Sequence, residues 1–161
     1  MEPDVIVEIG VKHGGGALML AHLCDLLGKG KVIGVDITLD LVHEKTKAHP
    51  RITLIQDDAC AAFEKVKSMI GPNDRVLVIE DSAHTYQNTL DVLNTYSPLV
   101  RLGDYFIVED SINYAGVFEN QDFGVARAIQ DFVLKGDFVS DRGKEPYVIT
   151  WNPKGFLKRV R

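Results

Sequence analysis

One stretch near the N-terminus constrains the fold of this chain more than any other. Residues 5–9 are mostly β-branched, which is typical of a buried strand, and a glycine-rich turn over 10–16 follows. After the turn, apolar residues recur at the spacing of one helix face: Leu20, Leu23, Cys24 and Leu27. Glycines let a backbone approach a ligand closely, and a helix N-terminus offers free N–H groups with partial positive charge. A strand, a glycine turn and a helix in this order therefore predict a site for a nucleotide-like ligand.

The positions of the glycines indicate which ligand is expected. The dinucleotide fingerprint has the spacing Gly-x-Gly-x-x-Gly. Here Glu8 stands two residues before Gly10, and the next glycines come only at Gly14 and Gly15. This spacing resembles the S-adenosylmethionine loop of class I methyltransferases, where the carboxylate can face the cationic end of the ligand and would repel a pyrophosphate. The alternative is an ordinary glycine-rich turn between a strand and a helix, with no ligand.

Composition limits the classes of protein to which this chain can belong. A length of 161 residues predicts a single domain over 1–161 with its own hydrophobic core. The net charge of −5 argues against a nucleic-acid partner, and the basic residues of 154–161 are interpreted as a solvated end. No apolar run has membrane-spanning length and no signal peptide is recognisable, so no membrane partner is expected. Cys24 and Cys60 are interpreted as reduced core thiols on apolar helix faces, which predicts a cytoplasmic protein.

Predicted strands and helices alternate along the chain. Strands are expected at 5–9, 31–36, 51–56, 75–79, 104–108, 137–139 and 147–151. Helices are expected after the glycine turn and at 38–47, 59–69, 86–97 and 123–133. Such alternation requires an α/β fold with a mostly parallel sheet and helices on both faces. Ligands of such sheets lie beyond the carboxyl ends of the strands, so the residues that end strands are the candidates for a functional site.

Acidic residues follow four of the first five predicted strands. Asp36 is placed to accept hydrogen bonds from two ribose hydroxyls. In the run Gln56, Asp57 and Asp58, a carboxylate could receive the adenine amino group, although Asp58 also stands where a helix cap belongs. This much negative charge at one edge of a sheet normally needs a cation to neutralise it.

Three further acids predict a metal site. If the strands 75–79 and 104–108 are neighbours, Asp81, Glu109 and Asp110 converge, and they cannot all stay ionised without a cation or strong donors. Hard oxygen ligands with room for water favour Mg²⁺, at roughly 2.1 Å, over zinc. The alternative is that Asp81 caps the following helix and that 109–110 lie in a solvated loop.

The histidines carry different signals. His84 follows Asp81 by three residues, and beside a metal site it is a candidate general base because imidazole titrates near neutral pH. The alternative for His84 is a helix N-terminus with no chemical role. His13, inside the glycine loop, is expected to contact the cofactor or solvent. Tyr86 and Trp151 are expected to pack. The remaining histidines carry no usable signal: His22, His43 and His49.

Several of these motifs together resemble a known family. The matching residues are Glu8 to Gly10 with Gly14 and Gly15, the runs 32–36 and 104–110, Asp81-x-x-His84, and the closing run 150–157. Over nearly the whole chain they resemble the cephalosporin hydroxylase-like group, which is similar to the macrolide-sugar O-methyltransferases. The resemblance implies a Rossmann-like class I methyltransferase fold with a seven-stranded sheet and S-adenosylmethionine as cofactor. It also implies Mg²⁺ bound by Asp81, Glu109 and Asp110, and catalysis by His84 together with Asp81.

The predicted cofactor site combines the glycine loop with the residues that end the strands. Its members are Glu8, Gly10, Val11, His13, Gly14, Gly15, Asp36, Ile37, Gln56, Asp57, Asp58 and Asp81. Two departures from the family pattern affect this site. Asp57 stands where family members often have glycine. Family members also usually carry several dozen residues ahead of the first strand, so the pocket here is expected to be open or closed by a second subunit.

The predicted reaction is the Mg²⁺-dependent transfer of a methyl group from S-adenosylmethionine to a hydroxyl of a small molecule. Paired oxygens on the substrate suggest a catechol or a sugar diol, and the sequence leaves both open. A nicotinamide-dependent oxidoreductase is a weaker alternative because of the glycine spacing. A non-catalytic module that binds S-adenosylmethionine or another protein is the other alternative. A chain this short could also form a homo-oligomer that shields its cleft.

Overall fold

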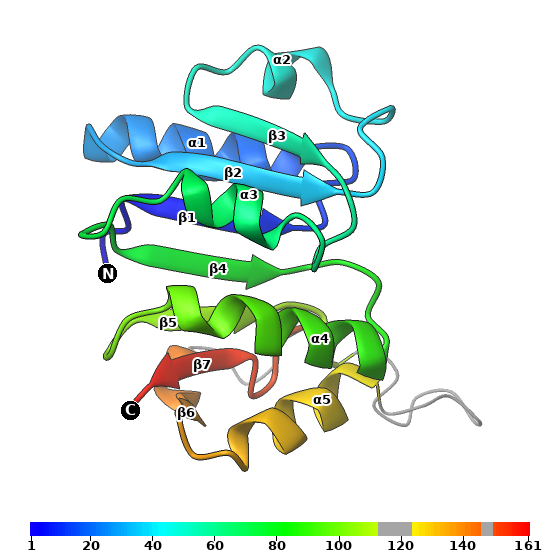
Figure 1. Ribbon diagram of the computed structural model, residues 1–161, viewed down its shortest axis with the longest axis vertical. Helices are drawn as coiled ribbons and strands as arrows, with labels where there is room; N and C mark the ends of the chain where they lie inside the picture. The colour runs from blue at the N-terminus through cyan, green and yellow to red at the C-terminus, as the bar shows by residue number, and fades with distance from the viewer. Residues whose placement is uncertain (113–123, 146–149) are drawn as a thin grey trace.

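The computed structural model describes residues 1–112, 124–145 and 150–161, and these residues form a seven-stranded sheet (Figure 1). The strands are β1 (Val5–Ile9), β2 (Lys31–Asp36), β3 (Ile52–Gln56), β4 (Val76–Glu80), β5 (Tyr105–Val108), β6 (Phe138–Ser140) and β7 (Phe156–Arg159). The helices are α1 (Gly15–Leu27), α2 (Glu44–Lys47), α3 (Phe63–Ser68), α4 (Tyr86–Tyr96) and α5 (Gly124–Val133). Two short 3₁₀ helices, Ser97–Leu99 and Arg142–Lys144, complete the described elements.

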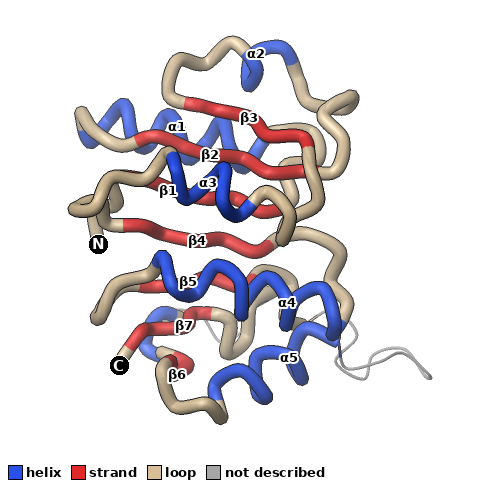
Figure 2. Tube along the Cα trace, in the orientation of Figure 1, coloured by secondary structure: helices blue, strands red, loops and turns tan. Residues whose placement is uncertain are grey.

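The order of the strands confirms the predicted fold class. The sheet runs β3-β2-β1-β4-β5-β7-β6 (Figure 2). The first five strands in this order are parallel. The strand β7 is antiparallel to both β5 and β6. Because β4 and β5 are neighbours, the residues that follow them meet at the same edge of the sheet, as expected.

Alternating residues of the strands pack into two cores. Val5, Val7 and Ile9 point into the larger core, which α3, α4 and α5 cover. Ile6 points to the opposite face and packs against α1. Figure 1 shows the same arrangement, with α1 behind the sheet and the other three helices in front of it. Glu8 shares the α1 face with Ile6, so an acid lies beneath the helix that follows the glycine turn.

The buried face of α1 differs from the predicted one. The helix buries Ala17, Leu20, Ala21 and Cys24. Leu23 and Leu27, which were expected on this face, are 47% and 48% exposed. The two alanines let the helix approach the sheet closely. The spacing of the leucines had indicated a different buried face.

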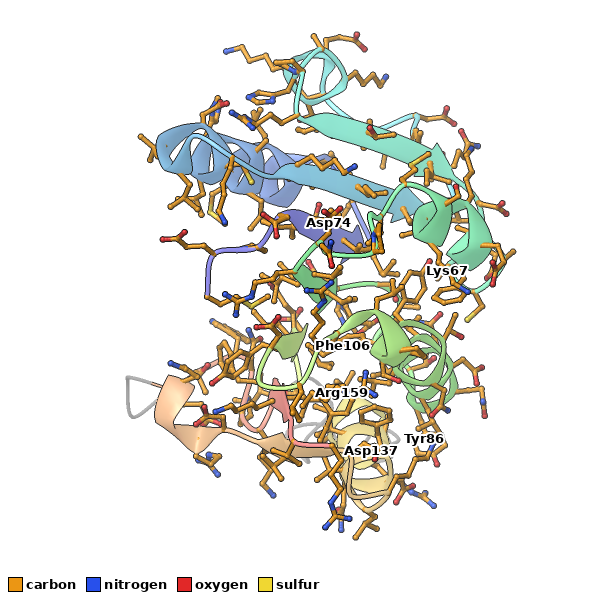
Figure 3. The ribbon with its side chains drawn as sticks, turned by 60° about the vertical axis from the view of Figure 1, so that its left-hand side comes forward. Lys67, Asp74, Tyr86, Phe106, Asp137 and Arg159 are labelled. Atoms are coloured by element: carbon orange, nitrogen blue, oxygen red, sulfur yellow. The ribbon has the colours of Figure 1, made fainter. Side chains whose placement is uncertain are left out.

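The C-terminal segment is part of the sheet rather than the predicted solvated end. Leu157 of β7 is fully buried, and Arg159 donates hydrogen bonds to the carbonyl oxygens of Val100 (2.6 Å) and Ser97 (3.4 Å). Figure 3 labels Arg159 among the side chains around this edge of the sheet. The strand expected at 147–151 is not supported where it can be checked. Residues 147–149 lie outside the described part of the chain, and Trp151, expected to pack, is exposed in a bend.

Two predicted helices are shorter than expected. Only Glu44–Lys47 of the expected helix 38–47 is helical. The helix α3, expected from residue 59, begins at Phe63. The residues before it form a turn, because the Asp58 carboxylate accepts hydrogen bonds from the amides of Cys60 (2.9 Å) and Ala61 (3.1 Å). Cys60 therefore lies in that turn, partly buried, and not on a helix face. The expected start of α5 at 123 lies outside the described residues. Among the helices that the structure describes, none has the length and apolarity to cross a membrane.

Candidate active site

The glycine turn leads from β1 into α1 and packs against the residues that follow β4, at the carboxyl edge of the sheet. Gly10 has a φ of +93°, and a Cβ at this position would lie 2.1 Å from the carbonyl oxygen of Asp81. Gly14 has a φ of +83° and lies against the side chain of Thr46. Both positions therefore require glycine, since a side chain at position 10 would push the loop away from the end of β4 and one at position 14 would collide with Thr46.

Asp36 holds the glycine loop in shape. Its Oδ2 accepts hydrogen bonds from the backbone amides of Val11 and Lys12, both at 2.8 Å, and its Oδ1 accepts one from Thr38 at 3.1 Å. Burial alone would raise the pKa of Asp36, but these amide donors outweigh it, so the pKa is lowered. Asp36 is thus ionised and bound to the backbone of the glycine loop. Its contact with ribose hydroxyls stays a prediction.

Glu8 is a buried acid at the wall of the site. It is 5% exposed, and a Cβ on Gly16 would lie 2.2 Å from its Oε1. Burial raises its pKa to about 8, with further contributions from the negative charges of Asp81 and Glu109. Its Oε2 has no hydrogen-bond partner within the described ranges. A buried acceptor without a donor fits a cationic or hydrogen-bonding ligand in this position.

These residues surround a cleft of about 620 Å³ at the carboxyl edge of the sheet. Most predicted cofactor residues line it: Glu8, Gly10, Val11, Asp36, Ile37, Asp57, Asp58 and Asp81. The remaining ones do not line it: His13, Gly14, Gly15 and Gln56. His13 and Gln56 have exposed side chains, while Gly14 turns the chain into α1. Lys12, Ser82 and Asn88 also line the cleft but were not predicted; Lys12 and Ser82 directly adjoin predicted residues, which was the available signal.

At one end of the cleft, two acids and a histidine converge. The His84 Nε2 lies 3.6 Å from Oδ1 of Asp81 and 3.5 Å from Oδ2 of Asp110. One ligand atom from each of the three residues lies within 4.8 Å of the others. Glu109 is not in this group, but it is close enough for Asp81 and Asp110 to raise its pKa, in addition to the larger effect of burial. The site thus brings the predicted base between two of the three predicted metal ligands, Asp81 and Asp110.

The local backbone supports a site rather than a helix cap. Thr85, and not Asp81, caps α4, because its side chain accepts the amide hydrogen bond of Asn88. His84 and Asp110 both have a φ of +52°, which is the left-handed region that residues other than glycine rarely adopt. Strain of this kind persists only where surrounding contacts fix it, and it concentrates at functional sites.

The segment 150–155 fixes the loop that carries Asp110. The backbone amide of Asp110 donates a hydrogen bond of 2.8 Å to Oδ1 of Asn152. The Ser111 hydroxyl donates to the carbonyl of Pro153 at 2.7 Å, and the amide of Ile112 donates to the carbonyl of Trp151. Asn152 was not singled out from the sequence, although it lies in the closing run of the family resemblance. No local pattern could reveal its partner 42 residues away.

A second buried acid, Glu80, holds the loop that carries Asp81. It is fully buried at the end of β4, and its Oε1 accepts hydrogen bonds from the Ser82 amide and hydroxyl and from Asn88. Burial is the main reason that its pKa is raised. Because Ser82 and Asn88 both line the cleft, Glu80 couples the end of β4 to the start of α4 beneath the site.

The sheet order, the glycine loop and the cleft at the carboxyl edge define a class I methyltransferase domain. Within that class, the chain belongs to the family described as rhamnosyl O-methyltransferase/CmcI, whose model matches residues 1–160. This confirms the resemblance found in the sequence.

Similar proteins include curated enzymes and solved structures. The chain is 30% identical over 168 residues to a rhamnosyl O-methyltransferase of Mycobacterium leprae, covering 99% of this chain and 72% of that protein. An apo-structure of CmcI is 29% identical with a TM-score of 0.77, and it covers 100% of this chain. A structure of CmcI with Mg and SAM is 27% identical with a TM-score of 0.74, again over the whole chain. The chain spans 66% of the length of each of these two CmcI chains.

Proposed function

We propose that this chain transfers a methyl group from S-adenosylmethionine to a sugar hydroxyl, with Mg²⁺ held by Asp81 and Asp110 and with His84 beside it as the base. The convergence of these three residues at the end of a cleft that begins at the glycine loop carries the proposal. Relatives described as rhamnosyl O-methyltransferases favour a sugar over a catechol. The family and the glycine spacing disfavour a nicotinamide-dependent oxidoreductase.

The charges and the lining residues of the cleft suit S-adenosylmethionine. The unpartnered Oε2 of Glu8 would accept a hydrogen bond from the cationic amino-acid end of the cofactor. Asp36 ends β2 and lines the cleft, and its carboxylate would accept hydrogen bonds from the ribose hydroxyls. Ile37, which is 74% exposed, offers an apolar surface for the adenine, and Asp57 and Asp58 lie beyond it. When bound, the cofactor supplies an activated methyl group on a sulfonium.

The acids fit a hard divalent cation. Carboxylate oxygens of Asp81 and Asp110 face each other across His84, and burial is the main cause of the raised pKa of Asp81. Such crowded carboxylates are stabilised by Mg²⁺, which prefers oxygen ligands. Asp81 and Asp110 would hold it, with Glu109 beside them. When bound, the ion lowers the pKa of a substrate hydroxyl.

His84 is the proposed general base. Its Nε2 faces the cleft between two carboxylates, which stabilise the imidazolium that forms when the nitrogen takes the hydroxyl proton. With the proton held at Nε2 of His84, the substrate oxygen would be free to take the methyl group that the bound cofactor supplies. The loop contacts of Asn152 and Glu80 keep these groups in place for that step.

The test is incubation with radiolabelled S-adenosylmethionine, Mg²⁺ and a panel of rhamnosides, other glycosides and catechols. The proposal expects label in a glycoside with wild type and a loss of at least about a hundredfold with His84→Gln. Calorimetric titration with S-adenosylmethionine and with a nicotinamide cofactor accompanies the assay. Tight binding of the former without transfer to any acceptor would favour the non-catalytic module, and full activity in excess chelator would overturn the metal role.

A further inference from the structure

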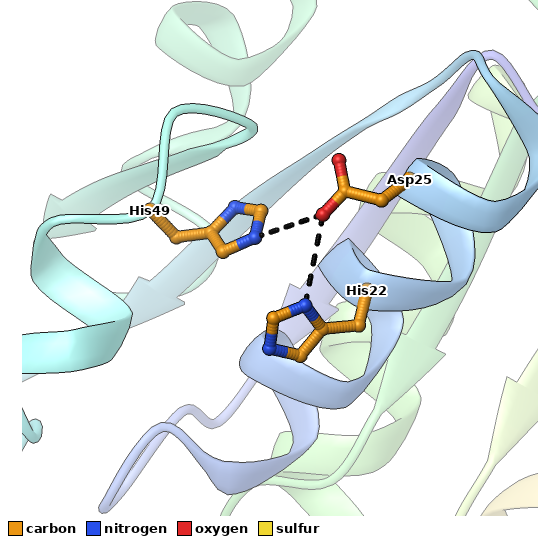
Figure 4. Close-up of side chains that lie close together, drawn as sticks. All are labelled: His22, Asp25 and His49. Carbon is orange, nitrogen blue, oxygen red and sulfur yellow. Dashed lines mark ion pairs between the residues drawn. The ribbon is translucent and has the colours of Figure 1, made fainter.

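A second cluster of potential ligands lies outside the cleft, on the side of the molecule formed by α1 and the entry to β3. His22 and Asp25 are three residues apart on α1, and His49 lies in the segment between α2 and β3 (Figure 4). The Nε2 of His49 is 3.2 Å from Oδ2 of Asp25, and Nδ1 of His22 is 3.6 Å from the same oxygen. One ligand atom from each residue lies within 4.8 Å of the others.

These distances match the coordination shell of a small borderline cation. With metal–ligand bonds of about 2.0–2.2 Å, neighbouring ligand atoms of a tetrahedral Zn²⁺ lie roughly 3.3 Å apart. The two distances to Asp25 lie on either side of this value. The side chain of His22 is 62% exposed and can move toward His49, which is only 10% exposed. A small movement of the His22 side chain would therefore bring the three ligand atoms together around one ion.

Arg51 prepares the Asp25 carboxylate for this role. Its Nε donates a hydrogen bond of 2.6 Å to Oδ1 of Asp25, and its guanidinium is itself held by the carbonyl of Gly30 at 2.8 Å. This contact keeps the pKa of Asp25 below its usual value and turns the other oxygen toward the imidazoles. A partner of this kind, which orients a ligand without touching the ion, is typical of metal sites.

Two contacts oppose tight binding. The positive charge of Arg51 lies next to the site, and Nδ1 of His49 accepts a long hydrogen bond of 3.3 Å from the Arg51 amide. A metal on Nε2 would require that nitrogen to release its proton and Nδ1 to take one up, which breaks this hydrogen bond. We therefore expect an affinity in the micromolar rather than the nanomolar range.

We propose that His22, Asp25 and His49 form a surface site for a borderline divalent cation such as Zn²⁺, with the fourth position open to water. Two imidazole nitrogens and one carboxylate oxygen suit Zn²⁺, whereas the hard-oxygen cluster in the cleft suits Mg²⁺. The bound ion would tie α1 to the segment that leads into β3. It would thereby stabilise the helix whose N-terminus follows the glycine loop.

The experiment must separate this site from the cleft, which also offers a histidine. We would titrate Zn²⁺ into the full chain by calorimetry at millimolar Mg²⁺, using a His84→Gln background. The proposal expects one remaining Zn²⁺ site and a rise in melting temperature on Zn²⁺ addition. Adding His22→Gln should weaken binding at least about tenfold and remove the rise. His22 is exposed, so this variant is expected to fold, and circular dichroism checks it.

The matched control is His43→Asn in the same background. His43 lies outside the cluster, and its side chain caps α2 by accepting the amide of Lys45, a role that asparagine can keep. This control should bind Zn²⁺ as the background does. Equal Zn²⁺ affinity in the proteins with and without His22→Gln, or no binding to the background protein at all, would overturn the proposal.

Discussion

Two clusters in this protein contain the same types of residue, yet their electrostatic environments differ. In the cleft, Asp81 and Glu109 have raised pKa values, because burial and neighbouring acids disfavour their charged forms. On α1, Asp25 has a lowered pKa, mainly because of its hydrogen bond with Arg51. In the surface cluster the hydrogen bond from Arg51 outweighs the cost of burial, whereas in the cleft the effects of Lys12 and His84 on Asp81 are smaller than that of burial. A site that waits for cationic ligands keeps charges that cost stability until those ligands bind.

The largest expected effect separates function from stability in these two regions. Asp81→Asn or Asp110→Asn should lower Mg²⁺-dependent turnover by about a thousandfold or more, since each removes a carboxylate from the cluster. The unfolding free energy should stay the same or rise, because a like-charge contact between partly buried acids is relieved. Asp25→Asn should do the opposite and lower stability while leaving turnover intact. Methyl transfer assays and urea unfolding of all three variants measure both quantities.

An acid outside both clusters would serve as the reference. Asp91→Asn on the exposed surface of α4 should leave turnover within a few-fold of wild type and the unfolding free energy nearly unchanged. If Asp25→Asn lost turnover as strongly as Asp81→Asn, the division between a functional and a structural cluster would be wrong.

The next effect concerns the pH dependence of stability. The folded pKa of Glu8, about 8, lies above its ordinary value of 4.5, so the folded state holds this proton more tightly than the unfolded state. Stability contributed by Glu8 is therefore present below pH 4.5 and is lost as pH rises toward 8, at up to about 1.4 kcal/mol per pH unit. Between pH 5 and 8, the unfolding free energy of Glu8→Gln should fall less than that of the wild-type protein, by on the order of 3 kcal/mol. Urea unfolding of the ligand-free protein in chelator measures this difference, and identical slopes would contradict the burial argument.

The third effect tests the base. His84→Gln should lower turnover by roughly a hundredfold, because proton abstraction loses its acceptor while the carboxylates remain. The affinity for S-adenosylmethionine, measured by calorimetry, should change by less than about threefold, since Glu8 and Asp36 stay in place. Wild-type turnover with His84→Gln would remove this residue from the mechanism.

The parallel part of the sheet was predictable from sequence, whereas in the C-terminal part β6 was predicted, at 137–139, and β7 was not. Buried parallel strands appear as apolar runs followed by polar residues, so β1 to β5 and the acids that follow them could be placed. The strand β7 has the sequence Phe-Leu-Lys-Arg, in which only Leu157 is fully buried, so its charges suggested a solvated end. Its place between β5 and β6 depends on pairing with distant residues, which short patterns do not encode.

The candidate site divides in the same way. Residues at strand ends, such as Asp36 and Asp81, follow from topology alone. The buried face of α1 could not be predicted from topology, because Ala17 and Ala21 contact the sheet where larger leucines were expected. The meeting of His22, Asp25 and His49 was equally hidden, since their signals come from separate elements that only the fold brings together.

The smallest effect tests whether a distant contact shapes the metal site. Asn152→Ala removes the acceptor that holds the Asp110 amide, so the left-handed backbone of Asp110 should relax and Mn²⁺ affinity should fall by roughly tenfold. Electron paramagnetic resonance of free Mn²⁺ measures this without a substrate. Asn152→Asp keeps the acceptor oxygen and should retain the affinity within a few-fold. High Mg²⁺ should restore turnover to Asn152→Ala, because the ligands themselves remain, whereas it should not rescue Asp110→Asn. If both Asn152 variants bound Mn²⁺ as wild type does, the strain at Asp110 would have to be fixed by the Ser111 and Ile112 contacts alone.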